Sequence, residues 1–147
     1  MSRVEVMHGV NLDMLGGRDP LHYGEFTLRE LEQRIETVAE ELGLEVHNFQ
    51  SNDEGEFVER IHKLPGTTDA VIVNAGAWSH YSYAIRDALE FANLPVVEVH
   101  LSDITAREEW RRRTVFEDLK PVIGRIHGKG ADGYREALEL IAAQLKQ

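Results

Sequence analysis

Two short stretches of the sequence carry side chains that could move protons. In the first, Tyr23 follows Arg18 by five residues in a glycine-rich segment. A tyrosine can act as a base only as its phenolate, which a neighbouring guanidinium stabilises, most strongly where water is excluded. In the second, Glu98 precedes His100 by two residues. On a strand this spacing puts both side chains on one face, where the carboxylate can fix the imidazole's tautomer. The same two residues could equally form a structural pair.

The segment that holds Arg18 and Tyr23 is too long for an ordinary connection. It spans residues 8–24, whereas a strand-to-helix loop usually takes about two to six residues. Its apolar residues Leu12, Met14 and Leu15 are not needed in a disordered linker. Its glycines allow a hinge. We interpret the segment either as an active-site lid or as an Ω-loop in which Tyr23 only packs.

The hydrophobic pattern predicts five strands alternating with helices. Thr27 and Glu30 form a predicted capping box at the start of one helix. The predicted strands are 4–7, 44–49, 70–73, 95–99 and 122–126, and the predicted helices are 27–43, 56–64, 80–92, 107–113 and a last one after Gly133. Such alternation gives βαβ units and a parallel sheet. We therefore expect an α/β fold, a flavodoxin-like three-layer sandwich with a five-stranded parallel sheet, in one domain over residues 1–147.

Polar residues follow three of the predicted strands directly. In open parallel sheets the ligand lies beyond the carboxyl ends of the strands. The residues found there are His8 and Asn11 after the first strand, Asn74 to His80 after the third, and His100 to Ser102 after the fourth. The sequence thus predicts one edge of the sheet as the site.

Several kinds of chemistry lack their sequence signals. There is no phosphate-binding P-loop, no cysteine, and no paired spacing of metal ligands among the seven histidines. None of the four lysines follows a predicted strand, where a Schiff base would be expected. The pattern favours acid–base catalysis on a small polar anion, with no metal and no cofactor.

Charge and composition narrow the partners. A net charge of −10 and a pI near 5.1 argue against nucleic acid or an anionic membrane as the main partner. A basic island at Arg107 and residues 111–113 could bind a small anionic substrate, or it could be the solvated end of a helix. No signal peptide and no long apolar run is found, so we expect a cytoplasmic protein.

Four blocks of sequence resemble the type II 3-dehydroquinate dehydratases. The blocks are Gly9-x-Asn-Leu-x-x-Leu-Gly16 with Arg18-x-Pro-x-x-Tyr-Gly24; Asn52-x-Glu-Gly-Glu56 with Arg60-Ile-His62; Asn74-x-Gly-Ala77 with Ser79-His80 and Ala84-Ile-Arg-Asp-Ala-Leu89; and Pro95-Val-Val-Glu-Val-His-Leu-Ser102 with Ala106-Arg-Glu-Glu109 and Arg111. No single block is specific to this family, but the four together are.

The resemblance implies dehydration of 3-dehydroquinate to 3-dehydroshikimate through an enolate, without metal or Schiff base. It makes Tyr23 the base, Arg18 the cation that activates it, and His100 with Glu98 the general acid. Asn11 would orient a water molecule. The substrate would be held by Asn74, His80, Leu101, Ser102 and Arg111. Asp87 would reach a neighbouring subunit, because the family forms homo-oligomers, trimers that assemble into dodecamers.

The frame around these residues departs from the usual family pattern. His8 and Val10 stand where the family has asparagine and proline. The other departures are Asp13, Trp78, Tyr81, Asp103 and Thr105. We expect the two aspartates to add negative charge near the site, and Trp78 and Tyr81 to reshape its wall. Two alternatives therefore stay open: a paralogue that acts on another hydroxylated cyclic carboxylic acid, and a non-catalytic small-anion binding domain. For the dehydratase itself, aromatic biosynthesis and quinate breakdown are both compatible.

Overall fold

The computed structural model describes residues 1–147 and contains the five predicted strands in one parallel sheet. The strands are β1 (Ser2–His8), β2 (Leu44–Gln50), β3 (Ala70–Asn74), β4 (Val96–His100) and β5 (Val122–His127). Their order is β2-β1-β3-β4-β5, and every neighbouring pair is parallel. The predicted flavodoxin-like α/β class is confirmed. The strand order reverses direction between β1 and β3, which is where such sheets leave a crevice for a ligand.

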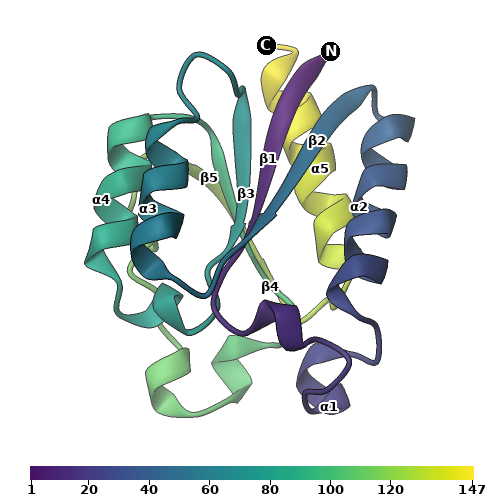
Figure 1. Cartoon of the computed structure of the whole chain (residues 1–147), viewed down its shortest axis with the longest axis vertical. Helices are drawn as coiled ribbons and strands as arrows, with labels where there is room; N and C mark the ends of the chain where they lie inside the picture. Colours follow the sequence, from purple (N-terminus) through teal and green to yellow (C-terminus); the bar gives the residue numbers. More distant parts are fainter.

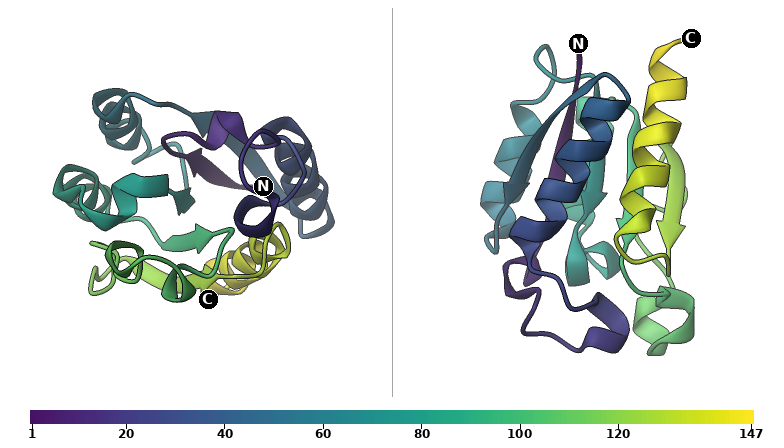
Figure 2. Two further views of the ribbon diagram at one scale, coloured as in Figure 1. Left: turned by 90° about the horizontal axis from the view of Figure 1, so that it is seen from below. Right: turned by 90° about the vertical axis from the view of Figure 1, so that its right-hand side faces the viewer.

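Four long helices cover the two faces of the sheet (Figures 1 and 2). Helices α2 (Leu28–Glu41) and α5 (Asp132–Leu145) lie on one face, and α3 (Glu54–His62) and α4 (Tyr83–Ala92) on the other. Alternate strand residues supply the two cores: Val6 and Ile72 pack toward α2 and α5, whereas Val71 and Val73 pack toward α3 and α4. Each such buried side chain contributes roughly 1.5–3 kcal/mol. None of the helices combines the length and the apolar character needed to cross a bilayer.

The predicted capping box is present at the start of α2. The Thr27 hydroxyl accepts from the Glu30 amide, and the Glu30 carboxylate accepts from the Thr27 amide. The start of α4 was predicted three residues too early. Ser82 caps this helix, its hydroxyl accepting from the Ile85 amide at 3.1 Å. Residues Gly76–His80 instead form a 3₁₀ helix, η2, directly after β3.

The predicted helix over residues 107–113 is wrong. The chain there forms two short 3₁₀ turns, η3 (Ile104–Ala106) and η4 (Glu109–Arg111). Between them Arg107 is extended, with φ −108° and ψ −162°. Its side chain contacts Tyr23 and Ser102 rather than solvent. These tertiary contacts override a local helical pattern.

The long segment after β1 is ordered. It contains the 3₁₀ turn η1 (Leu12–Met14) and the four-residue helix α1 (Pro20–Tyr23), and the buried side chains of Leu12 and Leu15 anchor it. Gly24 ends α1 with φ +80°, a value that favours glycine. In Figure 1, α1 lies beyond the carboxyl ends of the strands, at the same end of the molecule as the turns after β4. The segment therefore covers the predicted edge.

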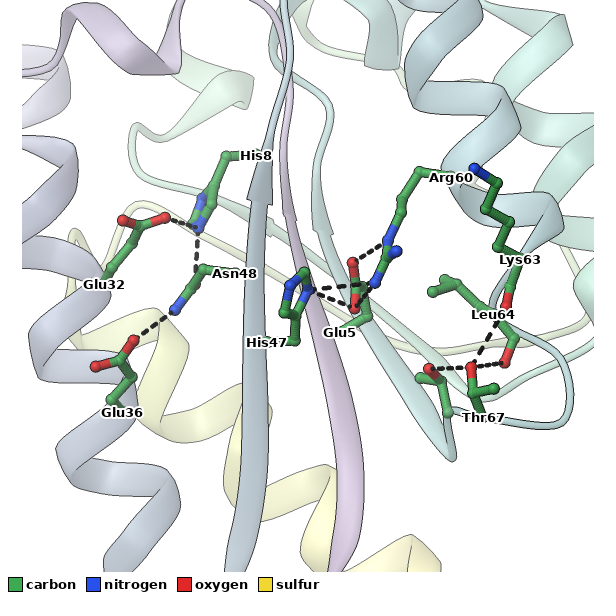
Figure 3. A network of polar contacts seen from close by, with 11 residues as sticks. Glu5, His8, Glu32, Glu36, His47, Asn48, Arg60, Lys63, Leu64 and Thr67 are labelled. Atoms are coloured by element: carbon green, nitrogen blue, oxygen red, sulfur yellow. Dashed lines mark hydrogen bonds and ion pairs between the residues drawn. The ribbon is translucent and has the colours of Figure 1, made fainter.

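Buried polar networks lie on both faces of β1 (Figure 3). On one face, Glu5 is fully buried and accepts from Arg60 at 2.7 and 3.0 Å, with His47 at 3.0 Å. On the other, the buried His8 donates from Nε2 to the Asn48 carboxamide oxygen at 3.0 Å, because that oxygen can only accept. Nδ1 of His8 has no hydrogen-bond partner. Burial lowers the pKa of His8 to about 4, although the bond to Asn48 opposes the shift.

Replacing His8 with asparagine is expected to make the free energy of unfolding less sensitive to acid. Between pH 6.5 and about 4 the unfolded chain binds a proton here that the folded chain excludes, so stability falls as the pH falls through this window. The His8 contribution is on the order of 3 kcal/mol, and asparagine has no such proton.

Urea unfolding at pH 7 and pH 4.5, at one protein concentration, measures the difference. The exposed His62, changed to asparagine, is the matched control and should lose stability as wild type does. The interpretation of His8 fails if its variant loses as much stability on acidification as wild type.

Candidate active site

The polar residues beyond β1, β3 and β4 surround a single cavity of about 70 Å³. Nine residues predicted from the sequence line it: Asn11, Arg18, Tyr23, Asn74, His80, His100, Leu101, Ser102 and Arg111. Two larger hollows, of about 540 and 670 Å³, lie between α2 and α5 and beside α4, and neither is lined by Tyr23 or His100. Because the proton-moving side chains converge on the small cavity, it is the candidate active site.

Two arginines hold Tyr23, in different ways. The guanidinium carbon of Arg18 lies 3.6 Å from the centroid of the phenol ring, above its face. Arg107 instead donates from one terminal nitrogen to the Tyr23 hydroxyl oxygen at 2.8 Å and to the Ser102 hydroxyl at 3.2 Å. A hydrogen bond to a charged group contributes about 1.5–3 kcal/mol. A phenolate at this position would therefore be stabilised by both cations.

From the sequence, Arg107 is only one member of a basic island, and 84 residues separate it from Tyr23. Its place in the Ala106–Glu109 block, beside a strand end rich in site residues, was the one available signal. Only the fold shows that its side chain turns inward, with 8% of it exposed.

The Glu98–His100 pair is present, and its carboxylate is surrounded by donors. His100 donates from Nε2 to one carboxylate oxygen at 2.6 Å. The other oxygen accepts from the Thr114 hydroxyl at 3.1 Å and from Arg125 Nε at 3.0 Å. Burial alone would raise the pKa of Glu98, but the bond and charge of His100, with Arg125 and Thr114, hold that pKa below its ordinary value. Glu98 is thus ionised, and it leaves Nδ1 of His100 for the cavity.

His80 offers an acceptor to the cavity. Its Nδ1 lies 2.7 Å from the Arg113 carbonyl oxygen, which can only accept, so Nδ1 carries the proton and Nε2 has a free lone pair. The ring stacks on that of His100, with centroids 6.1 Å apart and planes 24° apart. Burial lowers the pKa of His80, and the charges of His100 and Arg111 add to this, against the Arg113 carbonyl and Glu98.

Two asparagines complete the polar wall. The Asn74 carboxamide oxygen accepts from the Gly76 amide at 3.1 Å, which leaves its NH₂ group as a donor. Asn11 has φ +69° in the left-handed region, which asparagine tolerates better than most residues. The backbone N–H of Asn11 donates to the Asn52 carboxamide oxygen at 2.8 Å. The cavity therefore presents a phenol, two imidazoles, amides, a hydroxyl and three guanidinium groups.

The chain is similar to known proteins along nearly its whole length. Residues 2–142 match the family described as dehydroquinase class II. A 3-dehydroquinate dehydratase of Syntrophotalea carbinolica is 53% identical over 144 residues, covering 97% of this chain and 95% of the relative. A catabolic 3-dehydroquinase of Verticillium alfalfae is 43% identical over 145 residues, covering 99% and 95%. The type II dehydroquinase structure from Propionibacterium acnes superposes with a TM-score of 0.92 at 40% identity and covers 97% of both chains.

The chain belongs to the class II dehydroquinase family. The resemblance drawn from the four sequence blocks is confirmed, and the protein is accordingly a hydro-lyase.

Six of the seven departures from the usual pattern of this dehydroquinase family do not line the cavity. Trp78 was expected to reshape the wall, but it is buried in the core, with its ring 5.3 Å from that of Phe57. Tyr81 is exposed and does not line the cavity either. A buried indole gains more from packing on Phe57 than from the small polar cavity, because the hydrophobic gain follows the apolar area removed from water.

The two aspartates are also placed differently from expectation. Asp13 accepts from the Asn52 side chain at 3.2 Å, and Asp103 accepts from the Thr105 amide at 3.0 Å with His127 at 3.1 Å. Neither lines the cavity. Their charges are engaged outside it, so the expected opposition to an anion is not built into the wall. Val10 alone among the departures lines the cavity.

Two further predicted residues lie outside the wall. Glu98 lies behind His100 and binds its imidazole, as predicted, without reaching the cavity itself. Asp87 is exposed on α4, away from the cavity of its own chain. The sequence reasoning assigned it to a neighbouring subunit, and that stays a prediction.

Proposed function

We propose that this chain dehydrates 3-dehydroquinate to 3-dehydroshikimate. The observation that carries the proposal is the pairing of Arg107 with the Tyr23 oxygen on a cavity that also holds the Glu98–His100 pair. A stabilised phenolate is a base, and an imidazole with a buried carboxylate behind it can supply an acid. The identity of the substrate is inferred from the relatives named 3-dehydroquinate dehydratase.

In the proposed reaction the Tyr23 phenolate removes a proton from the carbon next to the substrate's ketone. The resulting enolate expels the β-hydroxyl, which His100 protonates so that it leaves as water. Asn11 orients a water molecule in the site. The free acceptor of His80 and the groups of Asn74, Leu101, Ser102 and Arg111 hold the hydroxyls and the carboxylate of the substrate.

The proposal includes neither a metal nor an imine intermediate, as the family resemblance implies. No lysine lines the cavity, so the wall offers no amine for a Schiff base. We place the reaction in the cytoplasm. Some relatives are named 3-dehydroquinate dehydratase and one is named a catabolic 3-dehydroquinase. Aromatic biosynthesis and quinate breakdown therefore both fit the proposal.

We also propose that the chain works as a homo-oligomer of trimers, assembled into dodecamers, with Asp87 reaching the neighbouring site. Asp87 supports this by its exposure on α4, next to the hollow lined by Tyr83, Arg86 and Arg113. The hollow shares His80 with the active-site cavity, so a second chain seated there would approach the site.

The Tyr23→Phe variant is expected to lose turnover while keeping its fold, because only the phenol's proton chemistry is removed. Positioned acid–base catalysis is worth roughly 10²–10⁴-fold, and a loss in kcat of that size is expected. Enone absorbance with 3-dehydroquinate gives the rate, and circular dichroism checks the fold. EDTA, or borohydride added with substrate, should leave wild type unchanged.

Near-normal turnover in Tyr23→Phe would show that another group is the base. A wild type that is inactive on 3-dehydroquinate but active on another hydroxylated cyclic acid would establish the paralogue. Inactivity on every such acid, with binding retained, would favour the binding domain.

Arg107→Gln is expected to lower kcat by about 10- to 150-fold, the equivalent of a charged hydrogen bond worth about 1.5–3 kcal/mol. Arg107→Lys should recover part of this, since an ammonium can still reach the phenol oxygen. Arg18→Ala should also cost turnover, but Arg18→Lys should recover little, because the flat guanidinium lies on the ring face.

The exposed Arg112, changed to glutamine, is the control from the same basic island and should leave the rate unchanged. Equal rates for wild type and Arg107→Gln would remove Arg107 from the mechanism.

Mixing two inactive variants tests the place of Asp87. If Asp87 serves a neighbouring site, Asp87→Asn and Tyr23→Phe chains refolded together should recover activity, because some sites then combine Tyr23 from one chain with Asp87 from the other. The assembly should also elute well above the 16.7 kDa of one chain. Glu90→Gln, exposed on the same helix, is the control and should be active alone. A monomeric protein, or no recovery on mixing, contradicts the role.

A further inference from the structure

Trp110 lies outside the cavity wall but contacts two residues that form it. Its side chain is half exposed and belongs to the turn η4. The guanidinium carbon of Arg111 lies over its ring, 4.1 Å from the centroid. The imidazole of His80 meets the same indole at right angles, with centroids 5.3 Å apart. An exposed aromatic residue in a short turn thus links two groups that come from different strand ends.

The contacts of Arg111 fix its plane and leave its outer nitrogens free. Nε donates to the Glu108 carboxylate at 2.7 Å, while the flat face rests on the indole of Trp110. The structure contains no hydrogen bond from the two terminal nitrogens to other protein groups. A planar guanidinium held from behind in this way presents a two-pronged donor, the geometry that matches a carboxylate.

His80 is held on three sides. The Arg113 carbonyl fixes its tautomer, the ring of His100 stacks on it, and Trp110 closes a third side. Only Nε2 is left without a partner, as an acceptor for a hydroxyl. Trp110 contacts both His80 and Arg111. Without the indole, this shared contact between the acceptor and the two-pronged donor is lost.

We propose that Trp110 is a positioning residue that sets Arg111 and His80 in register for a ligand carrying a carboxylate and a hydroxyl. The inference rests on the proposed function for the identity of that ligand, but not for the geometry. Trp110 touches no reacting atom, so its effect falls on binding rather than on the chemical step.

The first test compares Trp110→Leu with Trp110→Phe. Leucine is apolar but smaller than tryptophan and has no π face for the guanidinium, so KM for 3-dehydroquinate should rise about tenfold with kcat little changed. That change corresponds to about 1.4 kcal/mol. Phenylalanine keeps an aromatic face and should restore most of the affinity. A fall in kcat at unchanged KM, or equal KM values for leucine and wild type, overturns the proposal.

A double variant separates positioning from a general structural effect. In an Arg111→Leu background, the further change Trp110→Leu should raise KM by clearly less than tenfold, because one of the two groups it positions is already gone. A full additional tenfold rise would mean that Trp110 does not act through Arg111, and would overturn the proposal.

The second test needs no substrate. The NMR titration of ¹³C-labelled histidines, with His80 assigned by its loss in His80→Gln, should show the His80 midpoint moving upward in Trp110→Leu, since burial is the largest cause of its lowered pKa. Trp110→Phe should titrate like wild type. An unmoved midpoint in Trp110→Leu overturns the positioning role. A moved midpoint in a protein that does not turn over 3-dehydroquinate would mean that the proposed function fails while the role of Trp110 stands.

Discussion

Glu98 is an ionised carboxylate with no exposed surface in the middle of the interior strand β4, and the site depends on how its charge is compensated. Burying one unpaired ion costs several kcal/mol even after the protein relaxes. Here the cost is offset by three donors from three places: His100 on β4, Thr114 in the following loop, and Arg125 on β5. The same bonds therefore orient the imidazole, fasten the loop that carries the basic residues, and tie β5 to β4. Removing any of these donors would leave the buried carboxylate less fully compensated and would disturb the acid.

On the opposite side of the cavity, a buried positive charge lacks full compensation by the protein. Arg107 is almost fully buried, its Nε has no hydrogen-bond partner, and the carboxylate of Glu108 lies 3.9 Å from it. A guanidinium in this state is incompletely compensated by the protein. The deficit can be met by a phenolate at Tyr23 or by an anionic ligand in the cavity. In a chain with a net charge of −10, a local excess of cations here is specific to the site, and it supports the proposed base.

The parts of this structure that the sequence predicted are those with local causes. The capping box needs only Thr27 and Glu30, the buried strand 70–73 only its own apolar run, and the Glu98–His100 contact only the two-residue repeat of a strand. Once strands were placed, their carboxyl ends defined the site edge.

The contacts that join distant segments were not predictable in this way. Arg107 reaches Tyr23 across 84 positions, and Arg125 reaches Glu98 across 27. No sequence periodicity encodes the direction in which a loop arginine points. The contacts of Arg107 with Tyr23 and Ser102 also prevent the helix expected at 107–113. The prediction for Trp78 was wrong in the opposite way. This aromatic residue lies within a site motif, but its side chain packs in the core beneath the cavity.

The placement of the departing residues bears on what the cavity can accept. Val10 is the only departure in the wall of the cavity, and the other departures lie outside it. Valine in place of proline alters the backbone freedom of the turn more than the chemistry of the surface, because both side chains are small and apolar. Apart from Arg107, the polar residues of the wall are the ones that the resemblance predicts as site residues. The wall described here is therefore compatible with the proposed substrate, 3-dehydroquinate, and the departures outside it act only on how firmly the wall is held.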